Sequence, residues 1–354
     1  MLSYQFPAVK GFQADSEYYI CMIPLELLPK VFLFDNTDKI PEYRAQRKLN
    51  EARIPEIRDY IINNRASYVF SALAASVDGE MIFKPIADNL NIGLLEIDMS
   101  AAFLINDGQH RKAAIQAAMI EDESLAKETI PVVLFKDKGL ERSQQMFSDL
   151  NKHAVITSKS LNTLYESKDE IALITKKIIN NIDFLRKYTD KEKDNLGKFS
   201  SNIFTLNIFY SANKRILKKS TDIPSVESFI FSFWQNVVNN ITEWNEMYRG
   251  DLSKKDLREN YIITQGVTIL AFGQLGQFYY HNKGINMTES LEKLREIDWL
   301  RNNTKYWMHR AVKQNGAINR NEHGIQLTYI QIKRLLELDI SNEEIEKERA
   351  AGLL

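Results

Sequence analysis

A run of four polar residues and one glycine interrupts an otherwise apolar stretch of the sequence. It consists of Asp107, Gly108, Gln109, His110 and Arg111, between "FLIN" and an alanine-rich segment. Glycine permits a positive φ angle after a strand, and the first turn of a helix offers unpaired N–H groups to an anion. Arg111 adds a fork of donors suited to phosphate, and His110 can carry a proton near neutral pH. These residues therefore predict a phosphate site, with Asp107, Gln109 and His110 as the candidates for orienting water or holding a metal.

A structural interpretation of the same residues stays open. Asp107 could cap the helix, and Arg111 could pair with a surface acid. Two other stretches are expected to converge on this place, although a solvated helix face and an ordinary polar loop are the alternatives for them. Their candidate phosphate-binding residues are Gln46, Arg47, Arg53, Asn151 and Lys152.

The elements that must position these residues are strands and helices of an N-terminal α/β region. Apolar runs rich in aromatic and β-branched residues predict strands over 18–25, 30–34, 68–77, 81–86, 94–100, 101–106 and 130–135. Isoleucines at helical spacing predict a helix over 54–62. After about residue 141 the apolar spacing is mainly helical, and 325–344 is expected to include a packing helix. The prediction is an α+β fold with domains at 1–165 and 166–354.

Composition limits the class of protein. The 354 residues are 44% hydrophobic and 26% charged, with a formal net charge of −1, as in soluble globular proteins. Cys21 is the single cysteine, so we expect a buried small hydrophobe, no disulfide within the chain and a cytoplasmic protein. No apolar run reaches the roughly 18 residues of a membrane span. The sequence requires no metal or cofactor.

Four motifs in order resemble one known family. They are "AQRKLNEARIPEIRDYI", "YVFSALAASVDGE", the pentapeptide at 107–111 and "MFSDLNKHAVITSKSL", and "LRENYIITQGVTILAFGQLG" extends the resemblance into the second half. Together they are similar to the DndB branch of the DGQHR-domain family, which in turn resembles the ParB/sulfiredoxin fold. The resemblance implies a mixed-sheet N-terminal domain of that type. It also implies a phosphate-handling site built from Gln46-Arg47 and the turn from Gly108 to Arg111.

The resemblance also implies a function. Proteins of this branch belong to the DNA phosphorothioation system, which places sulfur in the DNA backbone as part of host defence. The implied role is a negative transcriptional regulator that binds double-stranded promoter DNA of its own operon, with other proteins of the system as further candidate partners. Because regulators commonly read paired half-sites as dimers, a homo-oligomer is also expected. Two alternatives stay open: a ParB-like nucleotide hydrolase using ATP or CTP with Mg²⁺, and a DNA-nicking component of the same defence system. Sulfur relay is disfavoured, because Cys21 has no Cys-x-x-Cys neighbour.

DNA binding would need basic surface in the helical half. Two segments there, 198–219 and 301–320, contain lysine and arginine but no acidic residue, and such segments can follow phosphates. Their apolar residues could equally serve the core. The candidate DNA-binding residues are Lys214, Arg215, Lys218, Lys219, Arg301, Lys305, Arg310 and Lys313.

Overall fold

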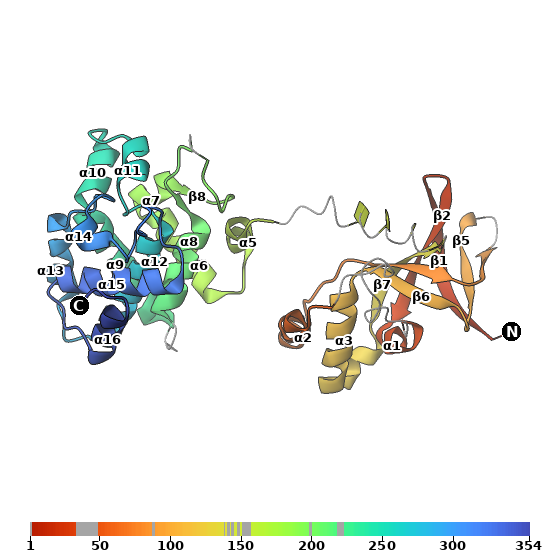
Figure 1. The fold of residues 1–354 in the computed structure, drawn as a ribbon. Coiled ribbons are helices and arrows are strands. Elements are labelled where there is room, and N and C mark those ends of the chain that lie inside the picture. Colours follow the sequence, from red (N-terminus) through yellow and green to blue (C-terminus); the bar gives the residue numbers. More distant parts are fainter. Residues whose placement is uncertain are drawn as a thin grey trace. The chain divides into compact units, whose positions relative to one another are not determined.

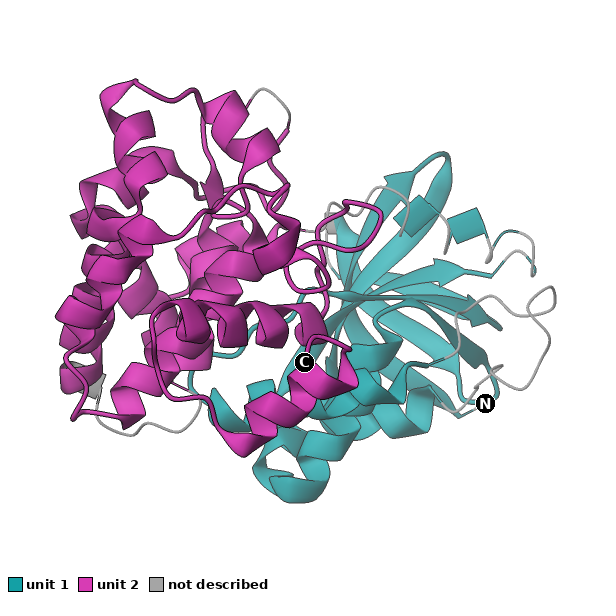
Figure 2. Cartoon of the chain, turned by 60° about the vertical axis from the view of Figure 1, so that its left-hand side comes forward, with its two compact units in different colours: residues 1–155 teal, residues 156–354 magenta. Residues whose placement is uncertain are grey.

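The chain divides into two compact units, residues 1–155 and 156–354 (Figure 2). The computed structural model describes residues 2–32, 49–86, 89–137, 139, 142, 145–146, 149–150, 157–197, 200–217 and 223–354. The division falls before the boundary predicted after residue 165, and α5 (Lys159–Tyr165) belongs to the second unit. Each unit is described by itself below.

A seven-stranded sheet forms the first unit, in the order β4-β5-β1-β2-β7-β3-β6 (Figure 1). The strands are β1 (Ser3–Gln13), β2 (Ser16–Pro24), β3 (Leu73–Asp78), β4 (Met81–Ile86), β5 (Asn89–Asp98), β6 (Ala102–Asp107) and β7 (Thr129–Lys136). Neighbouring strands are antiparallel, except that β3 and β7 run parallel. The predicted mixed sheet is confirmed.

Alternating side chains give this sheet one strongly buried face. In β7 the buried residues are Ile130, Val132 and Leu134, with less buried residues between them, the pattern of a strand with one face in a core. Cys21 of β2 joins the same core, and burial raises the pKa of its thiol to about 12. The thiol therefore stays protonated at neutral pH, which confirms the prediction of a buried hydrophobe.

Helices at one side of the sheet complete the first unit (Figure 1). They are α1 (Leu28–Val31), α2 (Ile54–Asn63) and α3 (Gln109–Glu121), with 3-10 turns η1 (Leu25–Leu27), η3 (Glu51–Arg53) and η4 (Glu123–Lys127). Ile61 of α2 and Ile115 of α3 join the core beneath the strands. The helix predicted over 54–62 is confirmed.

One strand prediction in this unit was wrong, and another was confirmed only in part. The described part of 30–34 lies at the end of α1, because Leu28 and Val31 are three residues apart and both buried on one helical face. The strand predicted from residue 68 begins only at Leu73. Tyr68 instead packs edge-on against Phe70 and donates its hydroxyl hydrogen bond to Glu128.

The second unit is mainly helical, as predicted. Its elements after α5 are α6 (Glu170–Asn181), α7 (Asp183–Tyr188), β8 (Thr189–Asp190), β9 (Phe204–Thr205), α8 (Leu206–Ile216), α9 (Ile223–Asn240), α10 (Thr242–Arg249), α11 (Lys254–Asn260), α12 (Gly266–His281), α13 (Met287–Glu292), η5 (Lys293–Glu296), α14 (Thr304–Trp307), α15 (Glu322–Leu335) and α16 (Asn342–Ala350). The core contains four fully buried tryptophans, Trp234, Trp244, Trp299 and Trp307. Such large apolar side chains dominate the energetics of a core.

Helix α12 lies at the centre of this core and contacts α8, α9 and α15 (Figure 1). Most of its side chains are buried, so it is apolar on nearly every side. Helix α15 is also buried along much of its length, which confirms the packing helix predicted within 325–344.

We expect Gly273→Ala to destabilise the helical unit by about 1–2 kcal/mol, because overpacking forces backbone apart. A Cβ at Gly273 would lie 2.6 Å from the carbonyl oxygen and 2.9 Å from the Cα of Ala212 in α8. Thermal unfolding of the whole chain measures the effect. Gly284→Ala is the matched control, since a Cβ at Gly284 meets no described atom within 4 Å. Equal melting temperatures for the two variants would contradict the close packing of α8 and α12.

Candidate functional site

The polar pentapeptide forms a sharp turn between a buried strand and a helix. Strand β6 ends at Asp107, and α3 begins at Gln109. Gly108 between them has φ +102°, and a Cβ there would lie 2.3 Å from Cδ2 of Leu73. Position 108 therefore requires glycine for two reasons, the positive φ angle and the close packing of Leu73. The predicted strand, turn and helix are confirmed.

The guanidinium of Arg111 is held by the protein's own oxygens. Its Nη1 donates to the carbonyls of Ser71 at 2.7 Å and Ala72 at 3.0 Å and to the Ser71 hydroxyl, and its Nη2 donates to Oδ2 of Asp107 at 2.6 Å. The Arg111 side chain is 17% exposed. Arg111 thus ties the segment before β3 to the end of β6. This geometry favours the structural interpretation in part: Arg111 pairs with an acid, but the acid is Asp107, and Gly108 stands at the N-cap.

His110 of α3 holds the residues that lead into η3 and α2. Its Nε2 accepts a hydrogen bond of 3.0 Å from the backbone N–H of Asn50, which requires an unprotonated Nε2. Burial and then the positive charge of Arg53 lower the pKa of His110. The side chain of Asn50 in turn accepts from the N–H of Ala52 and caps η3. The structure therefore places Arg53 near enough for its charge to act on His110.

The first turn of α3 also contacts Phe32, which precedes residues 33–48 in the chain, whereas Asn50 follows them. Nζ of Lys112 donates to the carbonyl of Phe32 at 3.0 Å. Together, His110 and Lys112 fasten Asn50 and Phe32 to one helical turn. The predicted phosphate residues Gln46, Arg47, Asn151 and Lys152 lie outside the described residues.

The contact of His110 predicts a pH dependence. Because its pKa is lower in the folded chain than the ordinary 6.5, the unfolded chain binds a proton first as the pH falls. The contribution of neutral His110 to the stability of the folded chain is fully present above pH 6.5. It is lost as the pH falls from 6.5 through the pKa that His110 has in the folded chain. Between pH 7.5 and pH 5.5, the melting temperature of the His110→Gln variant should fall less than that of the unsubstituted chain. An equal fall in both would contradict a neutral His110.

Sequence reasoning missed a buried amide beside this turn. Asn106 is 2% exposed, and its Oδ1 accepts a hydrogen bond of 3.0 Å from the hydroxyl of Ser76. Its Nδ2 has no hydrogen-bond partner among the described residues. The signal in the sequence is an asparagine one position before the pentapeptide, at the end of an otherwise apolar strand.

The first basic segment of the helical unit has largely internal partners. Arg215 makes a two-pronged pair with Glu322, with both N–O distances at 2.7 Å. Nζ of Lys214 lies 5.9 Å from the ring centre of Tyr210. Lys218 and Lys219 lie outside the described residues.

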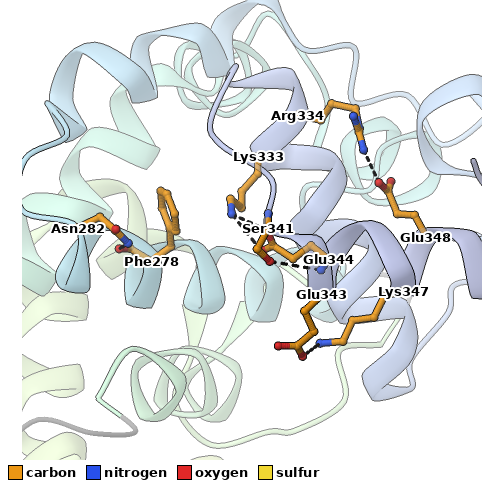
Figure 3. A network of polar contacts seen from close by, with 9 residues as sticks. All are labelled: Phe278, Asn282, Lys333, Arg334, Ser341, Glu343, Glu344, Lys347 and Glu348. Carbon is orange, nitrogen blue, oxygen red and sulfur yellow. Dashed lines mark hydrogen bonds and ion pairs between the residues drawn. The ribbon is translucent and has the colours of Figure 1, made fainter.

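Arg310 of the second basic segment is buried rather than exposed. It is 7% exposed, and its Nη2 donates to Oε1 of the fully buried Glu348 at 3.3 Å. Burial lowers the pKa of Arg310, although Glu348 opposes the shift. Arg334 of α15 also donates to Glu348 (Figure 3). A guanidinium in this position has no surface for a DNA phosphate, so Arg310 is not part of the interface proposed below.

The other basic residues of that segment lie at or near the surface. Lys305 and Lys313 are exposed, and Arg301 is half-buried. Arg301 donates from Nε and Nη2 to the carbonyl of Gly316 at 3.1 and 2.6 Å, which closes the loop between them. Trp307 within the segment is fully buried in the core.

Helix α11 adds basic residues that sequence reasoning missed. A cavity of about 470 Å³ is lined by Arg258 of α11 together with Arg301 and Arg320. Lys254 and Lys255 precede Arg258 on the same helix. Asp256 and Glu259 are interspersed with them, so α11 is not an acid-free segment of the sequence. The folded chain nevertheless places α11 beside the acid-free loop.

The part of the chain that the structure describes contains no group of three or more His, Cys, Asp or Glu side chains placed to hold a metal ion. No described helix is long and apolar enough to cross a membrane.

Comparison with known proteins gave one match. A family model, DndB, described as DNA-sulfur modification-associated, matches residues 6–339. No curated protein matched the chain. No solved structure matched it either.

Proposed function

Since the chain belongs to the DndB family of DNA-sulfur modification-associated proteins, we propose that it is a DNA-binding negative regulator of the operon for DNA phosphorothioation. Family membership supports a role in the DNA sulfur modification system. The regulator role, the operator in its own promoter and action as a homo-oligomer beside other proteins of the system are the further steps of this proposal.

The basic loop of the helical unit is the observation that carries the proposal. Residues 301–320 contain no acid, and the described side chains of Lys305 and Lys313 are exposed beside the half-buried Arg301. Lysine and arginine at a surface bind DNA phosphates and supply the affinity that does not depend on base sequence. The proposed interface consists of Arg301, Lys305 and Lys313.

A titration followed by fluorescence anisotropy tests the regulator role. The probes are a duplex from upstream of the chain's own operon and a shuffled duplex of equal length, each at two salt concentrations. Specific regulators bind their site at least about a thousandfold more tightly than other DNA, and we expect that preference here. Equal, steeply salt-dependent binding of both duplexes would contradict an operator-specific regulator. No binding would contradict a DNA-binding role altogether.

Lys305→Gln combined with Lys313→Gln should weaken binding of both duplexes. Each lysine that contacts a phosphate adds about one to the slope of log Kd against log salt concentration, so the double variant should lower the slope by about two. Lys177→Gln combined with Lys347→Gln is the matched control, because it removes the same charge. Those lysines pair with Glu227 and Glu343 elsewhere on the helical unit. A slope that the first double variant leaves unchanged would remove the loop from the interface.

No specific observation favours the nucleotide hydrolase or the nicking enzyme at residues 107–111. The Arg111 guanidinium that would bind phosphate there already donates to Asp107, Ser71 and Ala72.

A further inference from the structure

An open cavity of about 770 Å³ lies within the helical unit. Sites for small molecules typically have about 300–1,000 Å³. Helix α11, the beginning of α12, residues 194–196, Ser200 and residues 203–205 contribute to its wall, together with Ile318, Arg320 and Ile325. We propose that this cavity binds a phosphate-bearing small molecule of the nucleotide class. The proposal is independent of DNA binding, and it concerns a different unit from the one that contains the turn at 107–111.

One wall of the cavity is cationic. Lys254, Lys255, Arg258 and Arg320 line it, against the two acids Asp194 and Glu259. The carboxylate of Asp194 already accepts hydrogen bonds from the backbone N–H groups of Lys159 and Ser160, at 2.7 and 2.8 Å. The cations therefore outnumber the uncommitted acid, which favours an anionic ligand.

Arg258 has a fixed position in this wall. Its Nη1 donates to the carbonyl of Gly197 at 2.9 Å, and its Nη2 donates to that of Leu196 at 3.2 Å. Lys255 and Arg320 have no hydrogen-bond or ion-pair partner among the described residues, and both are exposed. The wall thus combines one immobilised guanidinium with two cations available to a ligand. The adjoining cavity of about 470 Å³ shares Arg258 and Arg320, which lengthens the space for a chain of phosphates.

The N-terminal end of α12 also faces the cavity. Thr264, Gln265, Gly266 and Val267 line it, and no side chain caps the helix. The first N–H groups of a helix lack intrahelical partners and favour an anion. The hydroxyl oxygen of Thr264 is buried and has no hydrogen-bond partner among the described residues. Because that oxygen is closed off from the cavity, the first backbone N–H groups of α12, and not the Thr264 hydroxyl, are the donors that this end of the helix offers to a ligand.

The remaining wall is apolar and suits the body of the ligand. Its residues are Phe204, Ile208, Val267, Leu270 and Ile325, from β9, α8, α12 and α15. A flat base packed there would place its phosphates toward Arg258 and the start of α12. Inorganic phosphate alone would leave this wall unused, which is why we propose a nucleotide.

Calorimetric titration of the full chain without DNA or divalent metal tests the proposal. The probes are ATP, pyrophosphate and adenosine. We expect ATP to bind, and both fragments to bind at least about tenfold more weakly, since each uses only one wall. Lys255→Gln combined with Arg320→Gln should weaken ATP and pyrophosphate but not adenosine, and Lys305→Gln combined with Lys313→Gln is the charge-matched control.

Three results would overturn the proposal. One is the absence of binding by both ATP and pyrophosphate. Another is ATP binding that the Lys255 and Arg320 double variant does not weaken, which would place the site elsewhere. The third is loss of DNA affinity in that double variant while ATP never binds, which would assign the cationic wall to DNA and leave the regulator proposal intact. ATP binding without DNA binding would support the cavity and contradict the regulator.

Discussion

Replacing Glu348 with alanine is expected to lower the free energy of unfolding of the helical unit by about 3–5 kcal/mol, the usual cost of removing one partner of a buried ion pair. The Glu348 side chain is fully buried and accepts from Arg310 and Arg334. Arg310 is itself 7% exposed. Without the carboxylate, its guanidinium stays buried with no counter-charge, and that desolvation is the main source of the loss.

Glu343→Ala provides the control on the same helix. Glu343 pairs with Lys347 at 2.7 Å, and its side chain is 79% exposed (Figure 3), so its loss should cost about 0.5 kcal/mol or less. Calorimetry on the full chain follows the transition of the helical unit. Glu348→Gln, which keeps the shape and one acceptor oxygen, should fall between the two. Equal melting temperatures for the alanine variants would contradict a structural role for the buried carboxylate.

Arg111→Ala is expected to destabilise the sheet-containing unit by about 2–4 kcal/mol, because hydrogen bonds from a charged donor to partly buried oxygens are lost together. The carbonyls of Ser71 and Ala72 and the carboxylate of Asp107 all lose their donor. The connection between the segment before β3 and the end of β6 is lost with them. DNA affinity of the folded fraction should stay unchanged, because the proposed interface lies in the helical unit.

Arg58→Ala is the matched control for Arg111→Ala. Arg58 of α2 pairs with Asp59 at 2.7 Å and with Glu121 at 3.0 Å at the surface, and its loss should change stability by no more than about 1 kcal/mol. Melting temperatures and DNA affinity are measured for both variants. If Arg111→Ala kept its melting temperature and lost binding of DNA or nucleotide, the turn at 107–111 would be a ligand site after all.

The local geometry of the pentapeptide was predictable from neighbouring residues. An apolar run, a glycine and an alanine-rich segment are enough to predict a strand, a turn and a helix, and Gly108 has the predicted positive φ angle. The partner of Arg111 was not predictable, because Ser71 and Ala72 lie about forty residues earlier and no periodicity reports that contact. Local patterns indicate which side chains can bind phosphate, but only the fold decides whether the protein's own oxygens occupy them.

Contacts between residues distant in the sequence also explain why the basic segments could not be assigned from the sequence alone. Residues 301–320 are free of acids, but Arg310 finds its acid in Glu348, 38 residues further along the chain. The converse holds for α11. Its sequence mixes acids with Lys254, Lys255 and Arg258, yet the fold places these three cations in one cationic wall. Charge counted along the sequence is a one-dimensional average, whereas a ligand meets the charges that the fold gathers from several segments.

The place of β7 in the sheet has a consequence for biosynthesis. Strands β4, β5, β1 and β2 are neighbours on one side of it, β3 and β6 lie on the other, and β7 alone joins the two groups. It is also the last of the seven strands to leave the ribosome. Until residues 129–136 are available, a nascent chain holds two partial sheets whose β2 and β3 edges have no partner, and unpaired edges invite association with other chains. The N-terminal unit therefore cannot complete its fold progressively during translation, and its closure waits for its final strand.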